Sequence, residues 1–160
     1  RVSNVHPSPS PDPRRSPNKQ HPPLPTMGAI SVQQPWPYAI FHEGKDVENR
    51  DFKPATELPA DIAIQVSKNI DKKPKLPRGF KHLADLPEAY SPEERGCVIG
   101  VVTLDEIVED DNSIWRQGAR YGWRLSNPRL LTKPVEMSGN QTTKEVPPDV
   151  LRKIKSRLKP

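Results

Sequence analysis

The chain has 160 residues, among them 21 prolines and a single cysteine, and carries a net charge of +5. One cysteine excludes an intramolecular disulfide and a cysteine-rich zinc site. No apolar run approaches the roughly 20 residues of a membrane-spanning helix, and the first residues lack the apolar core of a secretory signal. The sequence therefore predicts an intracellular protein without membrane association, most simply cytoplasmic, and leaves a nuclear location open.

Residues 1–26 form a proline-rich segment in which eight prolines stand among Ser, Asn, Arg, His and Gln. Such a segment cannot bury enough apolar surface to offset the entropy lost on ordering, so a disordered tail with polyproline II character is predicted. Because the chain begins with Arg1, the sequence leaves open whether this tail belongs to the native protein.

Charge is distributed unevenly along the chain. The tail carries +3 and residues 149–160 carry +4, whereas residues 27–148 carry −2. The basic balance therefore belongs to the two ends and does not indicate a nucleic-acid footprint on the body of the domain.

Apolar periodicity and turn residues divide the remainder of the chain into short elements. Residues 96–104 are almost continuously apolar, which indicates a strand buried on both faces. Asn127-Pro128 is predicted to close the strand before it. In chain order the predictions are a strand at 29–32, a helix at 35–43, strands at 47–52 and 62–66, a long and partly helical connection over 69–95, strands at 96–104, 121–125 and 130–135, a turn at 138–140 and a helix at 148–158.

The two predicted helices have different characters. In the first, Pro35 and Pro37 suit a first turn, where a missing N–H is tolerated, and Gly44 is a suitable stop. The second is basic and amphipathic. Together these elements predict an α+β domain around a small β-barrel, with short flanking helices, over residues 27–143, and a basic amphipathic C-terminal helix in residues 144–160. The sequence gives no sign of an oligomer.

The most informative segment contains Lys45, Glu48 and Arg50 within six residues. If it enters a strand, Glu48 and Arg50 share one face because side chains alternate with period two. These groups could grip a phosphate or a polar base edge. They could equally form a surface ion pair worth about 0–1 kcal/mol.

Six local patterns occur in a fixed order along the chain. Together they resemble the ASCH domain family over residues 29–142. The patterns are Ile30-Ser31-x-x-Gln34-Pro35-Trp36, Gly44-Lys45-x-x-Glu48-x-Arg50, Ile62-x-Ile64-x-Val66-Ser67-Lys68, Gly96-Cys97-x-x-Gly100-x-Val102, Gly122-Trp123-x-Leu125-x-Asn127-Pro128 and Pro134-Val135-x-x-Ser138-Gly139.

The resemblance implies a PUA-like β-barrel with a cleft lined by the segment that contains Lys45. Members of the family are generally proposed to bind RNA, and some resemble nucleoside-processing enzymes, including an N4-acetylcytidine amidohydrolase; ribonuclease activity is also reported for a relative. In the amidohydrolase-like members the lysine matching Lys45 is catalytic. Glu48 stands where those members carry a nucleophilic threonine, and a carboxylate cannot replace a hydroxyl nucleophile. That departure puts the acetylcytidine activity in doubt.

The candidate ligand-binding residues come from four parts of the chain. Each has a structural alternative: Gln34 could only cap a turn, and Tyr121 and Trp123, which share a face, could belong to the core although bases often stack on aromatic rings. Trp36 is predicted to be core, and Cys97 a buried small hydrophobe. The candidates are Gln34, Lys45, Glu48, Arg50, Ser67, Lys68, Tyr121 and Trp123.

No metal site or cofactor is predicted. His42 and His82 lack a neighbouring Cys or His ligand, and no glycine-rich phosphate loop is present. The resemblance implies a second carboxylate beyond the later strand in the amidohydrolase-like members, to which Glu106 or Glu109 could correspond, but both belong to an acidic run that is more typical of a solvated face.

The first functional hypothesis is a module that binds RNA or a nucleotide-like ligand in a single polar cleft. The alternative is an enzyme acting on RNA or a modified nucleoside, a ribonuclease or an amidohydrolase-like protein, with Lys45 and Glu48 as its acid–base pair. That alternative requires the two side chains to converge on one pocket. A third hypothesis is a protein-interaction module that uses the proline-rich tail. The sequence does not identify the ligand, choose DNA or RNA, or establish turnover.

Overall fold

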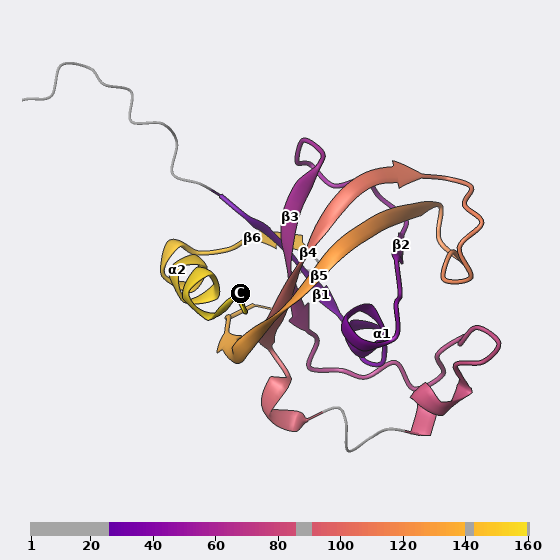
Figure 1. Ribbon diagram of the computed structural model, residues 1–160, viewed down its shortest axis with the longest axis horizontal. Coiled ribbons are helices and arrows are strands. Elements are labelled where there is room, and N and C mark those ends of the chain that lie inside the picture. The colour runs from indigo at the N-terminus through magenta and orange to yellow at the C-terminus, as the bar shows by residue number, and fades with distance from the viewer. Residues whose placement is uncertain (1–25, 86–90, 140–142, 160) are drawn as a thin grey trace, which may run out of the picture.

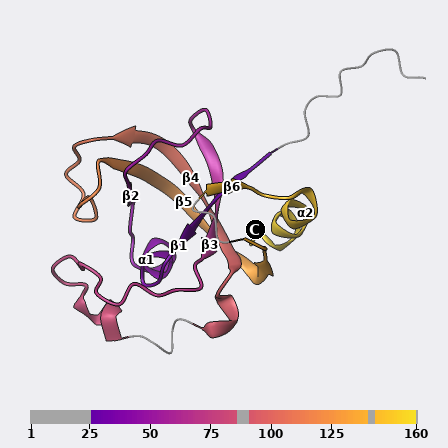
Figure 2. The same ribbon diagram turned by 180° about the vertical axis from the view of Figure 1, so that it is seen from behind.

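The computed structural model describes residues 26–85, 91–139 and 143–159. The predicted disordered tail lies outside these residues except for Thr26, and so does the last residue of the turn predicted at 138–140. One mixed sheet of six strands, in the order β2-β5-β4-β3-β1-β6, curls into a half-barrel (Figures 1 and 2). The elements are β1 (Gly28–Val32), α1 (Trp36–His42), β2 (Val47–Arg50), β3 (Ala60–Val66), the 3-10 helices η1 (Lys81–Asp85) and η3 (Pro92–Glu94), β4 (Cys97–Val108), β5 (Tyr121–Glu136), β6 (Thr143–Glu145) and α2 (Pro148–Arg157).

The sheet combines one parallel pair with antiparallel neighbours. β1 runs parallel to β3, with Val32 opposite Val66, and every other pair in the sheet is antiparallel. β4 is buried from Cys97 to Val102, as its apolar sequence predicts. The predicted helices and most predicted strands occur near their expected positions, and the α+β class is confirmed. Two differences concern strands: those predicted at 121–125 and 130–135 are one strand, β5, and β6 was not predicted.

The prediction that Asn127-Pro128 closes a strand is wrong. β5 passes through both residues and ends only at Glu136. The pairing with β4 shifts register here, since Val101 faces Arg129 and Thr103 faces Ser126. Asn127 takes a φ of 49°, a left-handed conformation that Asn tolerates better than most residues, and a bulge is a place where a strand accepts proline. A bulge therefore bends one long strand where the local sequence indicates a stop.

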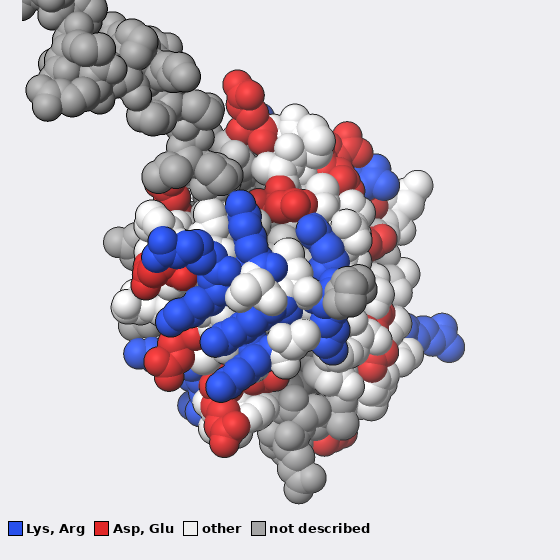
Figure 3. Space-filling view, turned by 60° about the vertical axis from the view of Figure 1, so that its left-hand side comes forward, with Lys and Arg blue, Asp and Glu red and all other residues white. Residues whose placement is uncertain are grey.

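α2 packs into the core of the domain. Its apolar face, formed by Val150, Leu151 and Ile154, lies in one buried cluster with Val98 of β4 and Leu131 of β5. β6 just before it pairs with β1 at the edge of the sheet, so the boundary predicted after residue 143 falls inside a strand. Arg152, Lys153 and Lys155 of α2 are exposed, whereas Arg157 is half-buried and donates to the Pro134 carbonyl at 2.8 Å. Figure 3 shows the side of the molecule that carries this helix.

The connection between β3 and β4 is tied to the end of β1. The Ser67 backbone N–H donates to the Val32 carbonyl at 2.8 Å, and the Asp71 N–H donates to the Gln34 carbonyl at 2.8 Å. Leu83 of η1 is buried and anchors the later part of the connection. These contacts hold residues 67–75 over the same end of the half-barrel as α1.

Candidate functional site

A cleft of about 890 Å³ opens at the end of the half-barrel that carries α1. Its walls come from the end of β1, from β2, from residues 67–75 and from the loop before β5. It is lined by Ser31, Val32, Gln33, Trp36, Lys45, Glu48, Asn49, Arg50, Ser67, Lys68, Asn69, Asp71, Lys73, Lys75, Gln117 and Gly118. Five of these residues are basic and two are acidic, so an anionic ligand suits the cleft.

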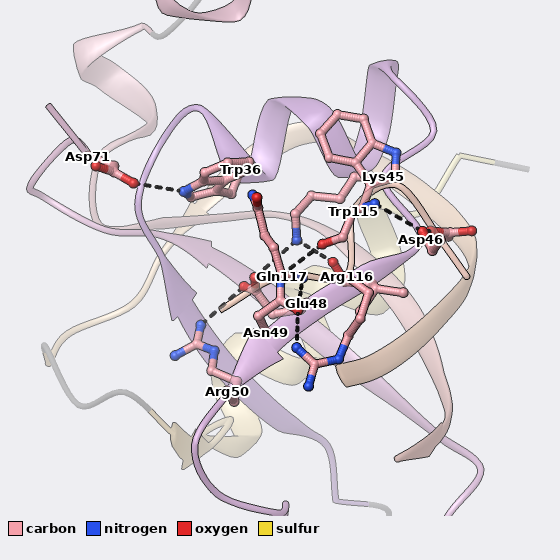
Figure 4. A network of polar contacts seen from close by, with 12 residues as sticks. Trp36, Lys45, Asp46, Glu48, Asn49, Arg50, Asp71, Trp115, Arg116 and Gln117 are labelled. Atoms are coloured by element: carbon pink, nitrogen blue, oxygen red, sulfur yellow. Dashed lines mark hydrogen bonds and ion pairs between the residues drawn. The ribbon is translucent and has the colours of Figure 1, made fainter. Parts of the chain in front are cut away.

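Lys45 reaches the floor of the cleft because α1 ends in a tight turn. Gly44 has a φ of +72°, a conformation that glycine adopts without strain, and the Lys45 N–H then donates to the Ala39 carbonyl at 3.0 Å. The turn directs the Lys45 side chain inward toward β2 (Figure 4). Its ammonium group lies 5.5 Å from the centre of the Trp36 ring, within range of a cation–π contact.

Lys45 and Glu48 form a buried ion pair. Lys45 Nζ lies 3.0 Å from Glu48 Oε1, and the two side chains are only 1% and 8% exposed. Lys45 Nζ also donates to the Val47 carbonyl. The two predicted catalytic side chains thus converge on one pocket.

Burial and charge shift the pKa of both partners. Burial lowers the pKa of Lys45 below its ordinary 10.5, an effect that the Glu48 carboxylate only partly offsets. Burial opposes ionisation of Glu48, but the charges of Lys45 and Arg50 outweigh it and hold its pKa below the ordinary 4.5. Glu48 is therefore a carboxylate at neutral pH, and Lys45 gives up its proton more readily than a surface lysine.

Arg50 completes the polar floor. Its Nη2 donates to the Ser31 carbonyl at 3.1 Å and lies 3.4 Å from Glu48 Oε2. The expectation that Glu48 and Arg50 share one face of a strand is therefore correct. Because the contact to Glu48 is long, Oε2 can still accept a hydrogen bond from a ligand. The other N–H groups of the guanidinium can donate to a ligand as well.

Asn49 alternates with these two residues and fixes the loop opposite. Its side-chain amide donates to the Trp115 carbonyl at 2.9 Å, and its Oδ1 accepts from Arg116 Nη1 at 3.1 Å and from the Gln117 N–H at 3.0 Å. These bonds bring Gln117 to the wall of the cleft.

Trp36 forms part of the cleft wall, although the sequence assigns it to the core. Its indole N–H donates to Asp71 Oδ2 at 3.1 Å, which joins α1 to the segment that begins at residue 67. The ring also packs against two apolar clusters, so it has both roles. It offers a π-surface in a lining that is otherwise mostly polar.

The rim carries lysines without carboxylate partners. Lys68, Lys73 and Lys75 are exposed and line the cleft. Within the described residues, no carboxylate lies within 4.0 Å of any of the three. Their charge is therefore available to a phosphate.

Three predicted ligand-binding residues lie outside the lining. Gln34 is 3% exposed, and its Oε1 accepts from the Tyr38 N–H at 3.0 Å, as a residue capping the turn into α1 would. Tyr121 and Trp123 are buried in the apolar cluster inside the half-barrel. The Trp123 indole N–H donates to the Phe52 carbonyl at 3.0 Å, so its polar atom is satisfied within the protein.

The other predicted residues come together, and the structure adds several that the sequence did not indicate. Lys45, Glu48, Arg50, Ser67 and Lys68 all line the cleft. The basic character of residues 72–75 was visible in the sequence, but nothing local linked it to β2. The added lining residues with polar side chains are Ser31, Gln33, Asn49, Asn69, Asp71, Lys73, Lys75 and Gln117.

Two kinds of feature are not found in the part of the chain that the structure describes. No group of three or more His, Cys, Asp or Glu side chains there is arranged to hold a metal ion. None of its helices combines the length and the apolar character needed to cross a membrane.

Comparison with solved structures supports the fold. A mutant of the ASCH protein from Zymomonas mobilis, in which one tyrosine is replaced by phenylalanine, aligns with a TM-score of 0.51 and 19% identity, over 83% of this chain and 99% of that one. The ASCH structure from the same organism without that mutation gives 0.49 and 17%, over 83% and 96%. A YTH domain from Zygosaccharomyces rouxii, in complex with N6-methyladenosine RNA, gives 0.41 and 16%, over 85% and 86%. No family model and no curated protein matches the sequence.

The chain has an ASCH-like fold, and its half-barrel with short helices fits the small PUA-like barrel expected from the sequence. The fold expected from the six sequence patterns is therefore confirmed. At this identity the likeness concerns the fold alone, and function rests on the site.

Proposed function

We propose that the protein is a binding module that holds RNA, or a nucleotide-like ligand, in the cleft between β2 and residues 67–75. The observation that carries the proposal is the buried Lys45–Glu48 pair, with the partly buried Arg50 beside it, on a cleft floor that is flanked by the unpartnered lysines of residues 67–75. Burial of the pair argues against an ordinary surface ion pair. The cationic rim beside it argues against a purely structural pair, whose stability would not depend on such a rim.

The chemistry of the cleft suits the parts of a nucleotide. Lys68, Lys73 and Lys75 supply charge for phosphates, as in proteins that follow a nucleic-acid backbone. Arg50 and Glu48 offer donors and an acceptor for a base edge or ribose. The volume of about 890 Å³ falls in the usual range of small-ligand sites, so an unstacked nucleotide fits better than a duplex.

The test measures binding of a fluorescent RNA of about six nucleotides to the full chain by anisotropy, from low to physiological salt. Lys73→Gln/Lys75→Gln is compared with Arg78→Gln/Lys81→Gln, which removes the same charge outside the cleft lining. We expect only the first variant to weaken binding, with a salt slope smaller by about 1.4, at about 0.7 per lost phosphate contact. Equal effects of the two variants would contradict the proposal. Measuring the binding of a DNA of the same sequence then shows whether the protein prefers ribose or deoxyribose.

The second candidate is an enzyme that acts on RNA or a modified nucleoside. The specific observation in its favour is that Lys45 Nζ and Glu48 Oε1 lie 3.0 Å apart on the floor of the cleft, with the pKa of Lys45 lowered by burial. A lysine with a lowered pKa can act as a general base, and Glu48 can orient a water.

Incubating the RNA with wild type and Lys45→Ala, and reading binding and cleavage in the same tube, separates the two candidates. Cleavage by the wild type that Lys45→Ala abolishes supports the enzyme. Lys53→Ala, prepared in the same way, is the control for nuclease contamination and for loss of one charge, and it should still cleave. Binding without cleavage supports the module. Release of small products from modified nucleosides is the corresponding assay for amidohydrolase-like activity.

A further inference from the structure

A second basic surface lies on α2, away from the cleft. Arg152, Lys153 and Lys155 are exposed on the helix, and Lys159 is exposed just after it. None of these side chains is among those that line the cleft. Figure 3 shows Lys and Arg side chains gathered on the side of the molecule that carries this helix.

This charge is concentrated and is not neutralised by neighbours. Residues 149–160 carry +4, whereas the preceding residues 27–148 carry −2. Among the described residues, no carboxylate lies within 4.0 Å of Arg152, Lys153, Lys155 or Lys159. Four cations without partners on one small surface repel each other, and an external polyanion relieves that repulsion.

The packing of α2 indicates which polyanion fits. An amphipathic helix binds a membrane by burying its apolar face in the lipid interface. In α2 that face, formed by Val150, Leu151 and Ile154, is already buried in the protein core. The outward face has no large apolar residue that could anchor an acidic protein partner. What remains is a rigid row of cations, which suits a regularly charged phosphate backbone.

We propose that the outward face of α2 is a second contact surface, which binds the phosphodiester backbone of RNA that extends beyond the cleft. The helix is about 15 Å long at 1.5 Å per residue. Over that distance the exposed cations can follow several consecutive phosphates of a single strand, as the positively charged grooves of single-strand-binding proteins do. The surface contributes affinity without sequence preference, and the cleft provides selection. The choice of RNA as the polymer rests on the proposed function. The assignment of α2 as a surface that binds a phosphate backbone does not depend on it.

The experiment uses the full chain and two single-stranded RNAs, one of about six nucleotides that can only fill the cleft and one of about 24. The α2 variant is Arg152→Gln/Lys153→Gln/Lys155→Gln. Its control, Lys53→Gln/Arg78→Gln/Lys81→Gln, removes the same charge from exposed positions on other elements. We expect the α2 variant to bind the short RNA as wild type does. For the long RNA its salt slope falls by about 2, at about 0.7 per neutralised cation.

Three results would overturn the inference. They are an unchanged salt slope for the long RNA, an equal fall in the control variant, or a loss of binding to phosphatidylserine vesicles in the α2 variant without a loss of RNA binding. The cleft variant Lys73→Gln/Lys75→Gln, measured alongside, keeps the two proposals separate. If it binds both RNAs normally while the α2 variant loses the long one, the cleft proposal fails and the α2 surface stands.

Discussion

Replacing Glu48 by Gln removes one charge from the buried pair and leaves the shape almost unchanged. The Lys45 ammonium, whose side chain is 1% exposed, then keeps the Val47 carbonyl but loses its carboxylate. Arg50 remains nearby and lowers the pKa of Lys45 further through its like charge. Breaking a buried pair from one side typically costs about 3–5 kcal/mol because an uncompensated charge stays buried. We therefore expect Glu48→Gln to lower the free energy of unfolding by about 3 kcal/mol at pH 7.

The loss should depend on pH in a defined direction. The folded-state pKa of Lys45 lies below 10.5, its ordinary value, and losing Glu48 lowers it further. Above that pKa the folded protein has released a proton that the unfolded chain still binds, so stability rises with pH. The deficit of Glu48→Gln should therefore shrink in alkaline solution. In the wild type, the depressed pKa of Glu48 gives stability above about pH 4.5 that is lost as the pH falls.

Urea unfolding followed by circular dichroism, at pH 7 and at alkaline pH, measures both effects. The control is Glu106→Gln, because the Glu106 pair with Arg124 has side chains 57% and 50% exposed. An exposed pair is worth about 0–1 kcal/mol. The double variant Lys45→Met/Glu48→Gln, which removes both charges of the pair, should recover part of the stability but not ligand binding. If Glu48→Gln costs no more than Glu106→Gln, the charge on Lys45 is screened by water and the reasoning about the cleft floor is wrong.

Three further predictions concern the scaffold. Gly100→Ala should cost about 1–3 kcal/mol in urea unfolding, because a Cβ would lie 2.6 Å from the Arg129 carbonyl oxygen and also meet the Phe41 ring; a neutral result would mean that the β4–β5 bulge can relax. Ile154→Ala should cost about 2–5 kcal/mol, since Ile154 is 0% exposed in the core, and a cost below about 1 kcal/mol would show α2 to be peripheral. Cys97, 5% exposed and with its pKa raised by burial, should react with a thiol reagent only on unfolding; rapid labelling of the native protein would contradict this.

The sequence determined the features that depend on near neighbours. The spacing of Trp36, Ala39 and Ile40, closed by Gly44, is enough to predict α1. The apolar run from residue 97 predicts a buried strand in the same way. Lys45, Glu48 and Arg50 could be singled out because they lie within six residues, where the turn and the period of β2 decide how they meet.

Sequence patterns misjudged β5 because its continuation past Asn127-Pro128 depends on a partner strand. Taken locally, a turn-forming pair ends a strand. Beside β4, the same pair forms a bulge and pairing resumes at Arg129. Local periodicity also predicts that Tyr121 and Trp123 share a face, but it does not determine whether that face lines the cleft or packs in the core. In the structure both residues belong to the core.

Only the tertiary structure decided which distant residues complete the site. Lys73 and Lys75 reach the cleft because the Asp71 N–H bonds to the Gln34 carbonyl and its carboxylate to the Trp36 indole, across more than thirty residues. The basic C-terminal helix was evident from its sequence, but its orientation follows from burial of Ile154 among strands far earlier in the chain. Short-range patterns can fix a turn, a period and a charge cluster, whereas long-range packing decides which of these face the same space.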